Sequence, residues 1–445
     1  MKKELINFEL PEKLKNEIIT EPTLISWVFN INADPLISDY ERTSTHYAEH
    51  FYFENATDNS GIYGVGSLPA VFTRIITNAS VEMTGPIEMI SGLFDETTDS
   101  SEIWGELSQT VTYLPKIIRT EKQNQQWVTI NMLVNSTEDL FVQWQEEIKN
   151  LYLFRQLERP STKKINKILI KEELKIEDWL QEVELSVAHL KSSETLNKIV
   201  LARQLKIMTE KSINPVDVLK RLRAEQPDTY RFVVAKNQSY FIGATPERLL
   251  QATTTDYSTV CVAGSIKRGK TLKEDQQLGD GLLSDQKNVI EHHYVVRWLQ
   301  EEMTKLTTSL DKKIPVSLLK NRDIQHLFLP IKGERKKEVT FSEGIAALHP
   351  SPALGGLPKK EAINWIKNHE YYPRGLYGGP LGWRNILEDT GEVVVGIRSA
   401  YICDNQAILY AGCGIVEDSI ATLEREETKV KFQPMLRALG GQINE

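Results

Sequence analysis

The run 231-RFVVAK and the run 240-YFIGAT flank the turn-forming residues Asn237, Gln238 and Ser239. The same arrangement recurs near the C-terminus, where 392-EVVVGIRSAYI and 406-QAILYAGCGIV flank Asp404 and Asn405. Apolar, β-branched runs joined by so short a polar turn predict adjacent antiparallel strands. These two hairpins decide the fold class, because a doubly wound parallel sheet would need a helix between its strands.

Further elements extend this α+β pattern on both sides. A strand is expected at 198-KIVLARQLKI, followed by a helix at 214-NPVDVLKRLRAEQP with Asn214 as N-cap and Pro215 at its first position. Long helices are expected at about 285–307, 359–369 and 422–438. Hairpins with separate helices indicate α+β, not a doubly wound fold.

The first part of the chain contains no motif to which chemistry can be assigned. Residues 1 to about 160 mix strand-like runs such as 127-WVTINMLV with turn-rich stretches. A polar, basic stretch around 159–174 precedes an amphipathic helical segment that includes Ile176, Trp179 and Val183. We place a boundary near 165–185, which divides the chain into an N-terminal scaffold region, 1–175, and a catalytic region, 176–445.

Composition limits the class of protein and of partner. The 445 residues are 40% hydrophobic and 26% charged, as in folded globular proteins. Fifty-three basic and 61 acidic residues give a formal charge of −8, which disfavours nonspecific binding to nucleic acid or anionic lipid. The three cysteines lack CxxC spacing, and no apolar run approaches the roughly 18 residues of a membrane span. We therefore expect a cytoplasmic protein without a nucleic-acid or membrane partner, and no obligatory protein partner is evident.

One motif suggests nucleotide binding and has to be weighed. The segment 264-GSIKRGKT matches the phosphate-binding pattern G-x-x-x-x-G-K-[ST] and follows the strand-like 259-TVCVA. The sequence after it, 272-LKEDQQLGDG, is highly charged and broken by glycines, whereas a P-loop helix must pack an apolar face on a parallel sheet. Nucleotide binding is kept only as a remote alternative.

Two helical segments carry candidate metal ligands. In 424-EREETKVK, residues Glu424, Glu427 and Lys431 stand at i, i+3 and i+7, on one helix face. Lys287 and Glu291 stand at i and i+4 in 287-KNVIEH. Either set could be a solvated face with ion pairs. The carboxylates could also hold Mg2+, which takes one or two protein carboxylates and keeps water or substrate oxygens in its other positions.

An acid and a base are candidates as well. Lys198 lies in an apolar strand on the face of Val200 and Ala202, where burial would favour the neutral amine that acts as a general base. It could equally pair with a carboxylate. Glu247 follows Pro246 at a strand end, where a carboxyl could stay protonated as a general acid or simply serve a turn.

The order and spacing of several motifs resemble one enzyme family. The motifs are 198-KIVLAR, 242-IGATPERL, 262-VAGSIKRG, 287-KNVIEH, 348-LHPSPALGGLP, 374-RGLYGGPLGW, 397-IRSAY, 411-AGCGIV and 424-EREETKVK. Over about residues 185–440 the chain resembles the chorismate-utilising enzymes, most closely the menaquinone-type isochorismate synthases. The resemblance implies a large antiparallel β-sheet sandwich with helices packed outside and the site in a cleft.

The resemblance also implies residue roles in a reversible isomerisation of chorismate to isochorismate. Lys198 would activate the water that attacks C2, and Glu247 would protonate the departing C4 hydroxyl. Glu291 and Glu427 would bind Mg2+, with Glu424 just outside through water. The residues implied to bind substrate are Gly264, Ser265, Lys287, His349, Tyr377, Arg398, Gly412, Gly414 and Lys431.

Related activities differ at informative positions. Amination enzymes of this family lack the lysine at the position of Lys198, and one class of them carries a lysine where this chain has Ala263. Salicylate synthases share Lys198 and Glu247 and go on to eliminate pyruvate, so this alternative stays open, as does isochorismate supply to a siderophore pathway. Asn288 departs from the aspartate that the family often has after the lysine.

Overall fold

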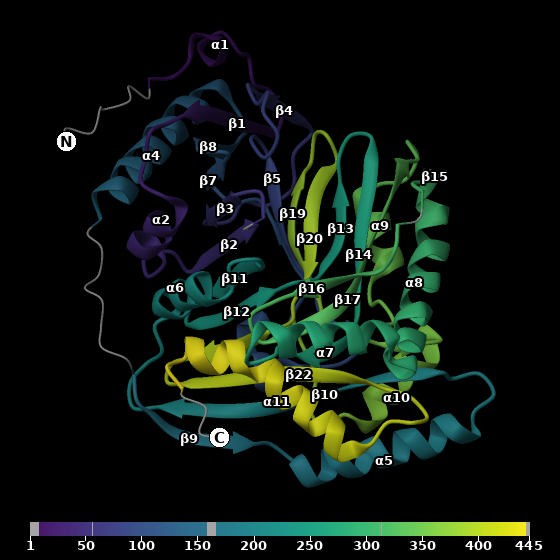
Figure 1. Ribbon diagram of the computed structural model, residues 1–445. Helices are drawn as coiled ribbons and strands as arrows, with labels where there is room; N and C mark the ends of the chain where they lie inside the picture. The colour runs from purple at the N-terminus through teal and green to yellow at the C-terminus, as the bar shows by residue number, and fades with distance from the viewer. Residues whose placement is uncertain (1–8, 56, 158–165, 313, 442–445) are drawn as a thin grey trace.

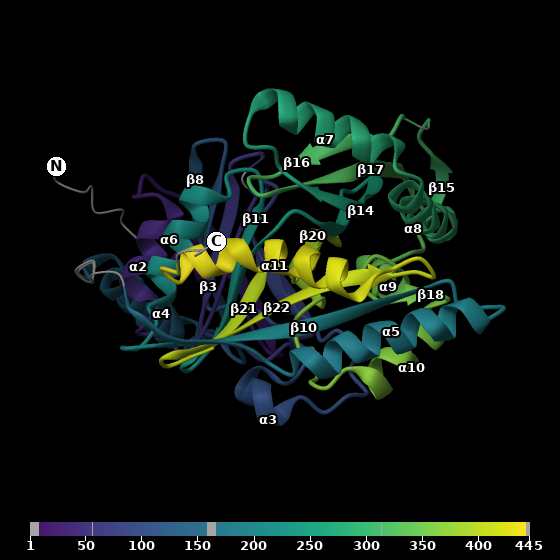
Figure 2. The same ribbon diagram turned by 60° about the horizontal axis from the view of Figure 1, so that its bottom comes forward.

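Two β-sheets stacked face to face, with helices on the outside, form the protein (Figures 1 and 2). The computed structural model describes residues 9–55, 57–157, 166–312 and 314–441. One hydrophobic cluster joins the inner faces, with Phe51 and Phe232 from one sheet and Met89 and Val394 from the other. The α+β class and the antiparallel sandwich expected from the sequence are confirmed. Within the described ranges no helix is both long and apolar enough to cross a membrane.

The larger sheet has 13 strands. One pairing, β1 with β4, is parallel, and every other pairing that the described residues make in this sheet is antiparallel. In spatial order its strands are β18 (Gly356–Leu357), β10 (Lys198–Thr209), β22 (Gln406–Ile415), β21 (Ser399–Cys403), β12 (Ser239–Thr245), β11 (Tyr230–Lys236), β2 (Glu49–Asn55), β3 (Ser60–Val65), β7 (Ile117–Lys122), β8 (Gln125–Val134), β1 (Thr23–Asn30) and β4 (Arg74–Thr77), with β9 (Ile168–Glu173) beside β10.

The smaller sheet has nine strands. They are, in spatial order, β15 (Thr307–Leu310), β17 (Ile324–Arg335), β14 (Asp256–Lys267), β13 (Arg248–Ala252), β20 (Thr390–Val395), β19 (Pro380–Asn385), β5 (Ile87–Ser91) and β6 (Val111–Tyr113), with β16 (Ser317–Lys320) beside β17. Strand β2 pairs with β11, and β5 pairs with β19. Both sheets therefore contain strands from before and after residue 175. The boundary between regions 1–175 and 176–445 divides the sequence, but it does not separate one sheet from the other.

The helices cover the outer faces of the sheets. They are α1 (Glu12–Lys15), α2 (Leu36–Thr43), α3 (Ser101–Trp104), the 3-10 helix η1 (Gly105–Leu107), α4 (Thr137–Gln156), α5 (Ile176–Ser192), α6 (Pro215–Glu225), α7 (Leu272–Ser284), α8 (Gln286–Leu306), α9 (Phe341–Leu348), α10 (Lys359–His369) and α11 (Ala421–Ala438). A second hydrophobic cluster joins the large sheet to α2, α4, α6 and α11. The expected helices near 214–227, 285–307, 359–369 and 422–438 are confirmed, and Asn214 Oδ1 accepts the Val216 N–H at 2.9 Å, as an N-cap should.

The first of the two hairpins that predicted the fold is confirmed, and the second requires a correction. Strands β11 and β12 join through Asn237 and Gln238, with Lys236 opposite Ser239. The run 392–402 is not one strand: it ends in the smaller sheet as β20, and the chain then crosses into the larger sheet to begin β21. Arg398 has φ +51 at this crossing, a conformation that extended strand residues do not adopt. Only β21 forms the hairpin with β22, through Asp404 and Asn405.

Phe232 tests how strongly the core between the sheets stabilises this arrangement. Its side chain is 0% exposed, and replacement by alanine should lower the free energy of unfolding by about 3–5 kcal/mol because it leaves a cavity. Phe141→Ala is the matched control, since Phe141 on α4 is 42% exposed and its loss should cost no more than about 0.5 kcal/mol. The shift of the urea midpoint, followed by circular dichroism, measures both. Equal losses in the two variants would contradict this account of the core.

Candidate active site

The candidate site is a cavity between the two sheets, bounded on the outside by α8 and α11. It contains about 650 Å3 of space not filled by atoms, part of it open to solvent. Its walls include ten of the residues expected from the sequence, which are Glu247, Gly264, Ser265, Glu291, Tyr377, Arg398, Gly412, Gly414, Glu427 and Lys431. Glu247 and Lys431, which are 184 residues apart in the sequence, thus meet in one place.

Two crossings of the chain between the sheets bring a carboxyl and a guanidinium to the same cavity. Glu247 lies where the chain leaves β12 for β13, and Arg398 lies where it leaves β20 for β21. The crossings are joined to each other, since Val395 N–H donates to Glu247 O at 3.0 Å and Ala244 N–H donates to Arg398 O at 3.2 Å. Both side chains are buried, so each crossing brings an ionisable group into the cavity.

Lys198 is fully buried and paired with one carboxylate. Its Nζ donates to Glu291 Oε1 at 2.8 Å, across from β10 to α8. Gly414 on β22 provides the space, because a Cβ there would lie 2.6 Å from Glu291 Oε1 and 2.8 Å from Lys198 Cε. The strand therefore needs glycine at this point. Glu291 faces the cavity and Lys198 lies immediately behind it.

Glu247 is suited to carry a proton at neutral pH. Burial raises the pKa of its carboxyl to about 7, against the opposing charges of Arg398, Lys198 and Lys431. Desolvation disfavours the carboxylate, and the three cations limit the rise. A carboxyl poised near neutrality inside a cavity is the arrangement expected of a general acid.

His326, to which the sequence pattern assigned no role, links Arg398 to Ser265 by hydrogen bonds. His326 on β17 lies with its Nε2 3.1 Å from an Arg398 terminal nitrogen and its Nδ1 2.8 Å from Ser265 Oγ. Guanidinium nitrogens only donate, so Nε2 accepts and Nδ1 carries the proton that it donates to Ser265. Burial and the charges of Arg398 and Lys431 hold the pKa of His326 well below its usual range, in agreement with a neutral ring. A lone histidine within the apolar run of β17 was the available signal.

Three carboxylates and three lysines form a charge-balanced cluster at the rim of the cavity. Lys287 Nζ lies 2.8 Å from Glu424 Oε1, and Lys431 Nζ lies 2.6 Å from Glu427 Oε1 and 2.9 Å from Gly412 O. The sequence expectation that these side chains gather at one place is met by the structure, since the carboxylates of Glu291, Glu424 and Glu427 all act on Lys287.

The same cluster fits the chemistry of Mg2+. Among the described residues no three His, Cys, Asp or Glu side chains are arranged to hold a metal by themselves. Mg2+ does not need three protein ligands, because one or two carboxylates, together with water and substrate oxygens, complete its coordination shell. Burial and the neighbouring charge of Glu427 raise the pKa of Glu424, so the two carboxylates repel each other and a cation near them would relieve that repulsion.

Arg374 connects the cavity wall to the edge of β10. It donates to Leu354 O at 2.8 Å and to Val200 O at 2.7 Å, and its Nε donates to Glu370 Oε2 at 2.8 Å. Glu370 Oε1 in turn accepts the Ala202 N–H at 2.7 Å. This pair fixes the strand that carries Lys198. Arg374 begins the motif 374-RGLYGGPLGW, but sequence reasoning assigned it no role.

Two features expected from the sequence lie elsewhere. His349 does not line the cavity: its Nε2 is directed at the backbone carbonyls of Leu93 and Phe94, at 3.1 and 3.2 Å. The segment 264-GSIKRGKT, which matches the phosphate-binding pattern, does not form a phosphate-binding loop. Strand β14 pairs antiparallel with β17, and the Gly269 N–H donates to the Asp275 carboxylate at 3.0 Å, in the place a phosphate oxygen would take. Nucleotide binding is therefore not supported.

The raised pKa of Glu247 predicts a pH-dependent effect of Glu247→Gln on stability. Above its ordinary value of 4.5 the unfolded chain releases this proton while the folded protein keeps it up to about 7, so wild type loses stability as the pH rises through this window. The variant has no proton to lose. Its free energy of unfolding relative to wild type should rise by up to roughly 3 kcal/mol between pH 4.5 and pH 8. Urea titrations at both pH values measure it, and a pH-independent difference would contradict the assignment.

Comparison with known proteins is consistent with this geometry. The sequence profile described as "Chorismate binding enzyme" matches residues 10–440. The chain is 35% identical over 361 residues to the isochorismate synthase MenF of Bacillus subtilis (strain 168), covering 80% of this chain and 75% of that protein. It is 34% identical over 267 residues to a salicylate biosynthesis isochorismate synthase of Pseudomonas aeruginosa, covering 59% of this chain and 55% of that one.

The fold has a solved counterpart. The structure of MenF, the menaquinone-specific isochorismate synthase from Escherichia coli, superposes with a TM-score of 0.80 and covers 96% of this chain and 97% of that one. Because the two sequences are 23% identical, this likeness shows that the fold is shared and nothing more.

Proposed function

Because this chain belongs to the family of chorismate-binding enzymes, we propose that it is an isochorismate synthase, an isomerase that interconverts chorismate and isochorismate. The observation that carries the proposal is a pair of buried groups beside one cavity: Glu247 in its wall, with a carboxyl pKa of about 7, and Lys198 directly behind Glu291, to which it donates a hydrogen bond. Displacement of one hydroxyl by water requires a proton donor for the leaving group and an acceptor for the attacking water.

Substrate binding is assigned to the cations of the cavity. Chorismate carries two carboxylates, and a chain of net charge −8 needs local positive charge to hold it. Arg398 offers a planar guanidinium fork that matches a carboxylate, with Lys431 and the Tyr377 hydroxyl nearby. The pyruvyl carboxylate is placed there, close to the backbone of Gly412 and Gly414, while Gly264, Ser265 and Lys287 bound the remainder of the site.

The chemical step uses two proton transfers. Lys198 takes a proton from the water whose oxygen bonds to C2 of the ring. Glu247 gives its proton to the C4 hydroxyl, which leaves as water as the C4–O bond breaks. One water enters and one leaves, so substrate and product are isomers and the reverse reaction exchanges the two roles. Glu247 is suited to donate because burial keeps its carboxyl protonated near pH 7.

Mg2+ completes the proposed site. Glu291 and Glu427 would hold it, with Glu424 linked through water, and the ion would supply positive charge for the ring carboxylate. The lysines now paired with these carboxylates keep the cluster charge-balanced when no metal is bound.

The proposal also covers the pathway, the roles of the two regions of the chain and the cellular location. We assign the product to menaquinone synthesis, the branch to which the sequence motifs are most similar, and catalysis to region 176–445, with 1–175 as scaffold. A cytoplasmic location suits Cys261, Cys403 and Cys413, which are all free thiols.

Product analysis with chorismate and Mg2+ tests the assignment. Wild type should yield isochorismate, and Lys198→Ala and Glu247→Gln should each lower kcat about 100-fold or more because each removes a proton-transfer group. Lys171→Ala, an exposed lysine on β9, should retain full activity. Chromatography with mass detection identifies the product. Salicylate and pyruvate as main products would support the salicylate synthase alternative instead, and an unchanged rate in Lys198→Ala would refute the role of the base.

Glu427→Gln tests the metal ligands. The variant should bind Mg2+ at least about tenfold more weakly than wild type, because one charged oxygen ligand is lost from a site that has few. Glu426→Gln is the matched control, since Glu426 lies one residue away and is 64% exposed, paired with Lys429. Calorimetric titration of Mg2+ in the presence of chorismate measures both variants. Equal affinities would contradict the assignment of Glu427.

A further inference from the structure

The first three turns of α11, which carry candidate metal ligands, have little apolar packing of their own. Among residues 421–431, all of which the structure describes, the buried ones are Ala421, Glu424 and Thr428, and none of these has a large apolar side chain. The first large apolar side chain of the helix that is buried is Phe432, in the hydrophobic cluster of the large sheet. The hydrophobic effect therefore anchors the C-terminal half of α11 far more firmly than its first turns.

Two features of the backbone weaken the connection of these turns to the rest of the helix. Pro434 lies inside α11 and has no N–H, so the carbonyl of Val430 lacks its usual helical donor. At the other end the N-cap residue, Ile420, offers no side-chain hydrogen bond to the N–H groups of the first turn. The orientation of the first turns therefore depends on their contacts with neighbouring elements.

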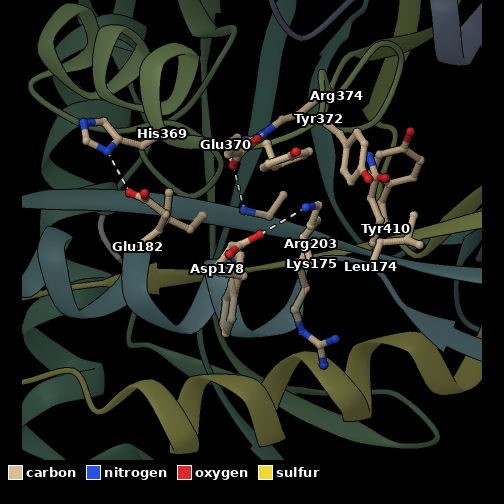
Figure 3. A pocket seen from close by; sticks show the side chains of 15 residues that line it. Leu174, Lys175, Asp178, Glu182, Arg203, His369, Glu370, Tyr372, Arg374 and Tyr410 are labelled. Atoms are coloured by element: carbon tan, nitrogen blue, oxygen red, sulfur yellow. Dashed lines mark hydrogen bonds and ion pairs between the residues drawn. The ribbon is translucent and has the colours of Figure 1, made fainter.

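Arg203 on β10 makes such a contact from the strand beneath the helix. Its Nε donates to Thr428 Oγ1 at 2.7 Å, and a terminal nitrogen donates to Arg425 O at 3.3 Å. The Thr428 hydroxyl donates its own proton to Arg425 O at 2.8 Å, so both of its hydrogen-bonding roles are used. The guanidinium also lies 4.9 Å from the centre of the Phe432 ring. Figure 3 shows it pointing toward the yellow helix α11.

Glu173, the last residue of β9, joins two arginines. Its Oε2 accepts from Arg203 at 2.9 Å, and its two oxygens accept from Arg425 at 3.0 and 3.2 Å. The Arg203 side chain is 1% exposed, so Glu173 supplies the opposite charge that a buried guanidinium requires. Two parallel bonds to the planar Arg425 group also restrict its angle. Glu173, Arg203, Arg425 and Thr428 thus form one clamp on the first turns of α11.

The clamp acts on helix positions directly beside the candidate metal ligands. Arg425 follows Glu424 and Thr428 follows Glu427, so each clamp residue lies about 100° further round the helix than the carboxylate before it. The carboxylates themselves face the lysines at the rim of the cavity, Glu424 with Lys287 as its partner. No hydrogen bond of the clamp uses an oxygen of Glu424 or Glu427. The clamp can therefore persist whether these carboxylates pair with lysines or with a cation.

We propose that Arg203 and Glu173 are positioning residues, which hold the first turns of α11 and thereby align Glu424 and Glu427 with Glu291 on α8. The inference rests on the proposed function in one respect, namely that these carboxylates bind Mg2+. Glu173 belongs to region 1–175, for which the sequence predicted only a scaffold role. That region then contributes to the metal site through the clamp, without touching the ion.

Hydrogen–deuterium exchange of the full chain without Mg2+ tests the clamp independently of any activity. Thr428→Val keeps the shape of the side chain and removes its hydroxyl. The backbone amides of residues 421–431 should then exchange about tenfold faster than in wild type, because a hydrogen bond from a charged donor is lost. The amides of residues 435–438 and of β22 should exchange as in wild type. Thr428→Ser keeps the hydroxyl and should leave the exchange of residues 421–431 close to that of wild type.

Calorimetric titration with Mg2+ in the presence of chorismate tests the link to the metal ligands. Thr428→Val and Glu173→Gln should each bind Mg2+ about tenfold more weakly than wild type, as is usual when a group that orients a ligand is lost. Saturating Mg2+ should restore kcat in both variants, because neither side chain touches the substrate. Thr428→Ser should bind Mg2+ as wild type does, and so should Glu172→Gln, which changes the exposed neighbour of Glu173 on β9.

Three results would overturn the proposal. The first is unchanged exchange of residues 421–431 in Thr428→Val. The second is faster exchange spread evenly over all of α11 and β22, which would indicate a general loss of stability. The third is local acceleration with unaltered Mg2+ affinity, which would separate the clamp from the metal ligands. If wild type bound no Mg2+ while Thr428→Val still showed the local acceleration, the hold of the clamp on α11 would be upheld and the metal site of the proposed function refuted.

Discussion

The site depends on two places where the chain leaves one sheet and enters the other. The crossings at 246–247 and at 396–398 lie beside each other and share two backbone hydrogen bonds, from Val395 to Glu247 and from Ala244 to Arg398. A strand that stayed in its sheet would point successive side chains alternately to core and surface. A crossing instead exposes its own side chains to the space between the sheets, so a buried acid and a buried guanidinium come to line the same cavity.

Burying so much charge requires that each charge be compensated. Three lysines pair with carboxylates: Lys198 with Glu291, Lys287 with Glu424 and Lys431 with Glu427. Arg398 instead donates a hydrogen bond to the neutral ring of His326. Removing one partner of a buried pair leaves an uncompensated charge, which is far more costly than the pair itself. The balance also explains how an acidic protein can present cations to an anionic substrate: its carboxylates pair with lysines around the cavity, whereas no carboxylate among the described residues accepts a hydrogen bond from Arg398.

The fold class and most helix positions could be predicted from local patterns, because hairpin turns and helical periodicity are read within ten or twenty residues. The crossing at 396–398 could not, since Gly396, Ile397 and Arg398 continue an apolar run and only the positive φ of Arg398 ends the strand. Helical spacing placed Glu424, Glu427 and Lys431 on one face, as the structure has them. Sequence reasoning assigned no role to His326 or to Arg374, and His349 does not line the cavity. The partners of the two histidines, and Val200 beside Arg374, lie on segments far away in the sequence, and no local pattern encodes such contacts.

Strand β10 shows how the fold fixes a reactive side chain at the end of a sheet. Lys198 is the first residue of the strand, where a two-residue strand, β18, is its neighbour on one side. Beyond it, no strand of the described residues pairs with that edge until β9 begins, and side chains replace the missing hydrogen bonds: Glu370 accepts from Ala202 and Arg374 donates to Val200. Replacing a neighbouring strand by an ion pair leaves the edge accessible from outside. The position of Lys198 is thereby set by Glu370 and Arg374, and Arg374 also lines the active-site cavity.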